Sequence, residues 1–287
     1  MTASNPPRDE PPAPLDSTAH LMNSISSQVT GRLRLISPSG RRRPAPPALV
    51  LVGHGSRDPR ALVTVRALMD RVRELRPALP VHLGHIELNE PLLPDTLAAL
   101  GDDTAAVLVP LLLTRGYHVK RDIPEMAAAA PVRARVAAPL GPHPLLVETL
   151  YTRLLEAGWP PAADAATRRT GGVVLASAGS RDPDSATDTR RTARLLADRL
   201  GVPVIPAYAS AAAPTVDTAV RALTARGRHR VAIASCFTAP GRFATECARQ
   251  APWIASDPLG AHEAMARLVL HRYDQTQALT EADLASA

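Results

Sequence analysis

The stretch Ala48-Leu-Val-Leu-Val-Gly-His-Gly-Ser-Arg-Asp-Pro59 is a short apolar run that passes into a turn containing two glycines. A run of this kind that ends in glycine is typical of a buried parallel strand. Apolar residues then recur at helical spacing across Arg60–Arg76, which predicts an amphipathic helix. The same alternation continues down the chain, and it predicts an α/β fold built from βα units.

Four such units are expected in the first half of the chain, each a strand followed by a helix. The expected strands are Ala48–Val52, Val81–Ile86, Ala105–Leu113 and a stretch near Val132–Ala138, and the expected helices are Arg60–Arg76, Leu92–Leu100, one after Asp122 and one near Leu145–Leu155. Four units of this length make one domain.

The chain then repeats itself. His54-Gly-Ser-Arg-Asp-Pro59 returns 124 positions later as Ala178-Gly-Ser-Arg-Asp-Pro183, and Leu140-Gly returns 119 positions later as Leu259-Gly. We therefore expect two similar lobes related by internal duplication, each a parallel sheet of about four βα units flanked by helices. The expected boundaries are a disordered tail at 1–46, lobes at 47–157 and 173–275, a linker at 158–172 and a tail at 276–287.

Composition narrows the class of partner. The 287 residues carry a net charge of +6 and only 3% aromatic residues, and they contain no known nucleic-acid motif, so an anionic small molecule is favoured over nucleic acid. No apolar run reaches the roughly 20 residues that a membrane span needs, and the N-terminus has no apolar core of the signal-peptide kind. We expect a cytoplasmic protein. Cys236 and Cys247 lack metal-ligand spacing, and one disulfide between them stays open.

The differences between the two halves indicate which half contains the active site. When the two halves are aligned, the candidate metal or proton-transfer residues of the first half are replaced in the second. Ala178 takes the place of His54, Ser210 of Glu87, Ala213 of Glu90 and Arg242 of His118. Glycine, proline and apolar positions persist in both halves. One active site therefore belongs to the first half, and its duplicate has become scaffold.

Position supports this interpretation. His54, Glu87 and His118 each follow a different expected strand, and ligands of parallel α/β sheets bind at the carboxyl ends of the strands. Imidazole suits divalent Fe, Co, Ni and Zn, and a neighbouring carboxylate can complete the coordination or accept protons. Glu87 is better placed for this than Glu90, which can instead stabilise the helix after Pro91 through the helix dipole.

Several other polar residues have structural explanations. Asp122 is interpreted as a helix N-cap ahead of Pro124, and Asp58 and Asp182, which recur in both halves, are interpreted as caps too. His82, His85, His143 and His262 are expected to be structural or on the surface. His85 is the least secure of them, because it points to the same side of its strand as Glu87. Ser56 lacks the surroundings of a serine nucleophile, and its turn lacks the P-loop lysine.

Three segments together resemble the sirohydrochlorin cobaltochelatases and ferrochelatases, the class II tetrapyrrole chelatases that need no ATP. They are the strand leading into His54-Gly-Ser, Glu87-Leu-Asn-Glu-Pro91, and Pro110-Leu-Leu-Leu-Thr-Arg-Gly-Tyr-His118-Val-Lys-Arg-Asp122-Ile-Pro124. The resemblance covers about residues 48–275 and is to the long, tandem-duplicated form. It implies that His54 and His118 bind the metal and that a glutamate at the Glu87 position assists. The chain lacks the His-rich run and the cysteine cluster of some long members, so we expect no permanently bound cofactor.

The function that this resemblance implies is insertion of Fe2+ or Co2+ into sirohydrochlorin, for siroheme or cobalamin biosynthesis, with the metal as substrate. The alternatives are a nickel or other tetrapyrrole chelatase, or a carrier of metal or tetrapyrrole without catalysis. The substrate carries many carboxylates, and the residues expected to hold it are Ser56, Arg57, Glu90, Arg115, Lys120, Arg121, Arg181 and Arg242. We expect a monomer, since the duplication supplies both lobes, and no nucleic-acid or membrane partner.

Overall fold

The computed structural model describes residues 46–101, 104–161 and 164–285, with side chains up to residue 279. The tail expected at 1–46 lies outside these residues except for Pro46.

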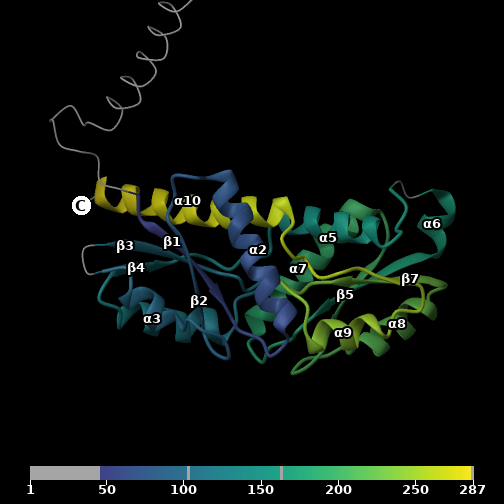
Figure 1. Cartoon of the computed structure of the whole chain (residues 1–287). Helices are drawn as coiled ribbons and strands as arrows, with labels where there is room; N and C mark the ends of the chain where they lie inside the picture. The colour runs from purple at the N-terminus through teal and green to yellow at the C-terminus, as the bar shows by residue number, and fades with distance from the viewer. Residues whose placement is uncertain (1–45, 102–103, 162–163, 286–287) are drawn as a thin grey trace, which may run out of the picture. The chain divides into compact units, whose positions relative to one another are not determined.

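Two parallel sheets of four strands each form the framework, which confirms the predicted fold class (Figure 1). The first sheet has the order β2-β1-β3-β4, with β1 Ala48–Gly53, β2 Val81–His85, β3 Ala105–Pro110 and β4 Arg133–Val136. The second repeats that order as β6-β5-β7-β8, with β5 Gly171–Ser177, β6 Val204–Tyr208, β7 Arg230–Ser235 and β8 Ile254–Ala255. In each sheet the chain goes from the first strand to one neighbour and then returns to the other side. This switch point is where open α/β sheets bind ligands.

Helices cover both faces of each sheet. The first half contains α2 Pro59–Leu75, α3 Leu93–Ala98, the π-helix η1 His118–Asp122, α4 Ile123–Ala128 and α5 Pro144–Glu156. The second half contains α7 Pro183–Leu200, α8 Val216–Thr224, α9 Arg242–Ala248 and α10 Glu263–Ala285. The helices α3 and α4 pack on one face of the first sheet, and α8 and α9 pack on the corresponding face of the second. Of the helices found in the described residues, none is long and apolar enough to cross a membrane.

The last helix of each half crosses to the other half. The helix α5 ends the first half, yet it packs on β7 and α7 of the second; α10 ends the second half, yet it packs on β3 and α2 of the first (Figure 1). Each sheet is therefore covered in part by a helix from the other half, so the lobes expected at 47–157 and 173–275 exchange their last helices. Apolar periodicity marks the buried face of a helix but does not say which sheet buries it.

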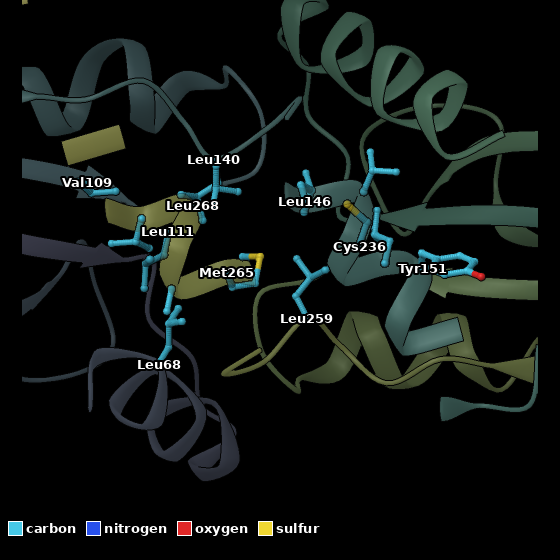
Figure 2. Packing of buried hydrophobic residues seen from close by; sticks show 14 of the residues in the cluster. Leu68, Val109, Leu111, Leu140, Leu146, Tyr151, Cys236, Leu259, Met265 and Leu268 are labelled. Carbon is cyan, nitrogen blue, oxygen red and sulfur yellow. The ribbon is translucent and has the colours of Figure 1, made fainter. Parts of the chain in front are cut away.

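This exchange joins the two sheets through one apolar core. Leu259 and Met265, which lead into and begin α10, lie between Leu111 of the first half and Cys236 of the second (Figure 2). Separate, smaller clusters fill the opposite face of each sheet. The relative position of the halves thus depends on buried packing as well as on surface contacts.

Two further boundaries differ from the expectation. The segment expected as a linker at 158–172 contains the helix α6 Ala165–Thr170, capped by Asp164, and β5 already begins at Gly171. In the tail expected at 276–287, residues 276–285 are helical, since α10 continues to Ala285. Pro160, Pro161 and small polar residues suggested a linker. Asp164 instead caps a helix, because its side chain accepts a hydrogen bond from the Thr167 N–H in the first turn of α6.

Candidate active site

The backbone places Glu87 beside His54. The pairing of β1 with β2 continues past the strand ends, where Ile86 N–H donates to Gly53 O at 2.9 Å and Glu87 N–H donates to His54 O at 3.0 Å. Gly55 permits this approach: it has a φ of +104°, and a Cβ there would lie 1.8 Å from the Glu87 carbonyl oxygen. As a result His54 Nδ1 lies 3.6 Å from Glu87 Oε1, and both side chains are half-exposed. A carboxylate at this distance can hold the imidazole or take a proton from it.

His118 opens the π-helix η1 in the segment after β3, and Asp122 fixes its ring. His118 Nδ1 donates to Asp122 Oδ2 at 2.5 Å. An ionised carboxylate only accepts, so Nδ1 carries a proton, and in the neutral imidazole the lone pair is then on Nε2. Asp122 was expected to cap the next helix, but its side chain makes no capping bond there. One turn of helix separates it from His118, and that spacing brings the two side chains together.

The two imidazoles meet at the switch point of the first sheet. The rings of His54 and His118 have centroids 4.8 Å apart and stand at 88° to each other. Nδ1 of His118 binds Asp122, and Nδ1 of His54 lies 3.4 Å from the Gly55 carbonyl oxygen and 3.6 Å from Glu87 Oε1, an orientation in which Nε2 is the nitrogen suited to a metal ion. Across the described residues there is no group of three or more His, Cys, Asp or Glu placed to hold a metal.

A cleft of about 970 Å³ opens beside His54. Its first wall comes from the turn after β1, from α2 and from Leu88 and Asn89. Its second wall is the segment 237–249 of the second half, which includes α9. The chain has two phenylalanines, Phe237 and Phe243, and both line that second wall. The volume is at the upper end of the range for small-molecule sites.

The corresponding space on the other side of the duplication is closed. There the segment after β3 meets α7, and three polar contacts fill the junction. Arg115 binds Asp188, with Nη2 2.7 Å from Oδ1; Lys120 Nζ lies 2.8 Å from both Asp182 and Asp184; and Thr114 and Ser185 share a hydrogen bond of 2.8 Å. At the open cleft, 124 positions later, Ala239 and Ala244 replace Arg115 and Lys120. Small side chains thus leave one cleft open, and ion pairs close its counterpart.

Four of the residues expected to hold the substrate make contacts within the protein. Arg115 and Lys120 are held by carboxylates of the second half instead of facing the cleft. Ser56 lines the cleft, where its N–H donates to Asn89 Oδ1 at 2.7 Å and its Oγ accepts from Asp58 N–H, so its role as a substrate contact stays a prediction. Glu90 lies outside the cleft and accepts from Leu92 N–H at the start of α3, which is the structural alternative.

The remaining expected arginines divide into two groups. Arg57 and Arg242 line the cleft, while Arg121 and Arg181 are exposed outside it. Arg242 stacks on Phe243, with its guanidinium carbon 4.8 Å from the ring centroid, and its Nε lies 3.6 Å from Glu246. Arg57 has no ion pair within the described residues, and neither does Arg249 on the opposite wall. Two cationic side chains are therefore left free to bind an anion.

Unlike Asp122, several other residues assigned to structural roles have them. Asp58 and Asp182 cap α2 and α7, and His143 and His262 cap α5 and α10 through Nδ1, so these predictions are confirmed. His85 is buried, and its Nδ1 lies 3.2 Å from the Pro91 carbonyl oxygen; burial lowers its pKa. Cys236 and Cys247 are both buried and free, which closes the question of a disulfide.

Sequence reasoning missed three contributors to this site. Asp122 was assigned to a cap, Asn89 was not singled out, and the wall formed by Phe243 and Arg249 was overlooked. One signal was available for the wall, because a chain with 3% aromatic residues carries both of its phenylalanines in one short segment.

The chain matches a family model and several curated proteins. A family model described as CbiX matches the chain twice, at residues 48–157 and 172–276. The chain is 32% identical over 176 residues to a sirohydrochlorin ferrochelatase of Bacillus subtilis, a match that covers 58% of this chain and 64% of the relative. It is 38% identical over 81 residues to a sirohydrochlorin cobaltochelatase of Methanococcus aeolicus, covering 28% of this chain and 57% of the relative. Each match spans less than two thirds of the relative's length.

The fold is similar to that of solved chelatases. SirB from Bacillus subtilis with Fe3+ superposes with a TM-score of 0.64 at 25% identity, over 83% of this chain and 98% of that one. Both lobes are included in a match of that extent, so the two-sheet arrangement is shared.

Proposed function

The chain belongs to the CbiX family, and on that premise we propose that it inserts a divalent metal ion, Fe2+ or Co2+, into sirohydrochlorin. The observation that carries the proposal is the pair of imidazoles with centroids 4.8 Å apart, of which His54 lines the cleft and His118 is oriented by Asp122. The relatives named for this activity support it. The product serves siroheme or cobalamin biosynthesis.

The metal is a substrate, and the site suits an ion that must leave again. His54 and His118 bind the ion through Nε2, and water or the macrocycle fills its other positions. Imidazole favours Fe, Co and Ni without fixing the ion as a closed cage would. Glu87, beside His54, accepts one pyrrole proton as the metal enters the ring, and water takes the second. Proton removal matters because the macrocycle binds metal only after losing its N–H protons.

The cleft holds the macrocycle. Phe243 offers an aromatic face, and Arg57 and Arg249 stand on opposite walls, each without an ion pair in the described part of the chain. Arginine forms charge-assisted hydrogen bonds to carboxylates, often with two N–H groups at once. We therefore assign Arg57 and Arg249 to the peripheral carboxylates of the substrate and Phe243 to one face of its ring.

Turnover under anaerobic conditions tests the proposal. Sirohydrochlorin in large excess is mixed with protein and with Fe2+, Co2+ or Ni2+, and metallation is followed by absorbance. A chelatase gives many product molecules for each protein molecule. A carrier stops after about one, and faster reaction with Ni2+ than with Fe2+ or Co2+ would favour the nickel alternative.

Substrate contacts are tested by equilibrium binding of metal-free sirohydrochlorin. Arg57→Ala and Arg249→Ala are each expected to weaken it about tenfold, on the scale of one charge-assisted hydrogen bond. Arg226→Ala is the matched control, because Arg226 is exposed and follows α8 outside the cleft. Unchanged affinity in both cleft variants would refute the assignment. The monomeric state and cytoplasmic location expected from the sequence stay predictions.

A further inference from the structure

We propose that the second half, which has lost the metal-binding histidines, positions His118: its helix α7 clamps the segment Arg115–Lys120 and so holds the imidazole where metal binds. The proposal rests on the proposed function. It assigns Asp188, Asp182 and Asp184 as positioning residues, none of which touches the substrate.

The first contact of the clamp lies three residues before His118. Arg115 backbone N–H donates to Asp188 Oδ2 at 2.9 Å, and the guanidinium donates through Nε at 3.0 Å and through Nη2 at 2.7 Å. The Asp188 side chain is 4% exposed. A buried carboxylate that binds both the backbone and the side chain of one residue fixes the position of that residue. The same bonds raise the pKa of Arg115.

The second contact lies two residues after His118. Lys120 Nζ is 2.8 Å from carboxylate oxygens of Asp182 and Asp184, and Asp182 is itself fixed by capping α7. Between the two contacts, Gly116 packs against the turn that precedes α7. A Cβ added to Gly116 would lie 3.5 Å from Ser180 Oγ. The segment is therefore held on both sides of His118.

The first half gives this segment less support. His118 is bound to Asp122, which belongs to the same short helix, and Tyr117 is 64% exposed. No residue of η1 is buried. A loop with few buried contacts fluctuates unless other bonds hold it, and a metal ligand must keep its geometry.

The duplication provides an internal comparison. At the corresponding segment of the second half, Arg242 replaces His118, and Ala239 and Ala244 replace the clamping residues. On α2, which corresponds to α7, Thr64 replaces Asp188 and Arg60 replaces Asp184. The clamp thus occurs where an imidazole has to be held and is absent from the matching place, where none is present. A clamp that served only to join the halves would gain nothing from this asymmetry.

Binding of Co2+ alone to the full-length protein tests the proposal. Asp188→Asn keeps the shape of the side chain and removes its charge, and Lys120→Met keeps the length and removes the ion pairs. Loosening a partner that orients a metal ligand typically costs 10- to 100-fold in affinity, so we expect the Co2+ dissociation constant to rise about tenfold in each variant. In turnover, KM for the metal should rise while KM for sirohydrochlorin stays within about twofold of wild type.

The control is Asp274→Asn. Arg76 and Asp274 also join the halves by a two-bond ion pair, at 2.6 and 2.8 Å, but they lie at the end of α2 and on α10, away from the His118 segment. This variant should leave Co2+ binding unchanged.

The outcomes separate the clamp from the site itself. If His118→Ala loses Co2+ affinity while Asp188→Asn and Lys120→Met do not, the clamp proposal is wrong and the site stands. If His118→Ala keeps its affinity, the proposed function is wrong at this site. If Asp274→Asn weakens Co2+ binding as much as the clamp variants do, the effect is general stability and the clamp proposal is overturned. Should Asp188→Asn fail to fold, as judged by circular dichroism, Lys120→Met decides alone, because the Lys120 side chain is itself 39% exposed.

Discussion

Replacing Asp122 by alanine removes the group that orients His118 and leaves the metal ligands in place. The bond from His118 Nδ1 to Asp122 Oδ2 is 2.5 Å long and charge-assisted, a class of bond that contributes about 1.5–3 kcal/mol. The two side chains are 36% and 23% exposed, so water replaces part of the lost bond. Because of this exposure, we expect the loss of metal-binding free energy to be near the lower end of that range, at about 1.4–2 kcal/mol. This corresponds to a loss of about 10- to 30-fold in metal affinity.

The assay is an anaerobic titration of the metal-free protein with Co2+, followed by the visible absorption of the bound ion. Asp122→Asn should lose less than Asp122→Ala, because the amide oxygen still accepts from Nδ1–H. Helix α4 should keep its stability, since Asp122 makes no capping bond to it. Asp164→Ala, which removes the cap of the distant helix α6, is the control that lowers stability without touching His118.

A Co2+ affinity of Asp122→Ala within twofold of wild type would refute this reasoning. So would a large loss of unfolding free energy with unchanged metal affinity, because Asp122 would then be the cap that the sequence suggested.

Three further predictions concern other parts of the molecule. Ala244→Lys, which restores the residue found at Lys120, should narrow the cleft and raise KM for sirohydrochlorin without changing Co2+ binding; an unchanged KM would contradict it. Ala178→His should not rescue His54→Ala in an insertion assay, since Ser210 and Arg242 still occupy the other places; recovery of the rate would show a second usable site. Burial and the neighbouring Arg272 and His271 lower the pKa of His143 to about 4, and the capping Nδ1 must be unprotonated, so stability should fall as pH drops from about 6.5 to 4. His143→Asn should flatten that decline, measured by denaturant unfolding, whereas the exposed His229→Asn should not.

Much of the fold could be predicted because it repeats local patterns. The apolar runs predicted the strands, and the His54-Gly-Ser turn located the end of the strand where the site lies. The turn at Gly55 returns at Gly179, where a Cβ would again lie 1.8 Å from a carbonyl oxygen. A geometry that only glycine tolerates persists in both halves, so the alignment of the repeats was secure.

The exchange of α5 and α10 was not predictable by the same means. Both helices have an apolar face, and the sequence does not say whether the nearer or the farther sheet covers it. The partners of Arg115 and Lys120 were missed for a related reason. A cation near a strand end pairs as readily with a carboxylate of the protein as with one of a substrate, and Asp188 lies 73 positions away. Asp122 was misassigned because an aspartate two residues before a proline also fits a helix start.

The initial rate of Co2+ insertion into sirohydrochlorin by His118→Ala, compared with wild type under anaerobic conditions, tests most directly the claim that one imidazole pair handles the metal. The account predicts a loss of at least about 100-fold with the circular dichroism spectrum unchanged, because a direct metal ligand is removed from a partly exposed position. A folded His118→Ala protein that inserts Co2+ at a rate near that of wild type would contradict it.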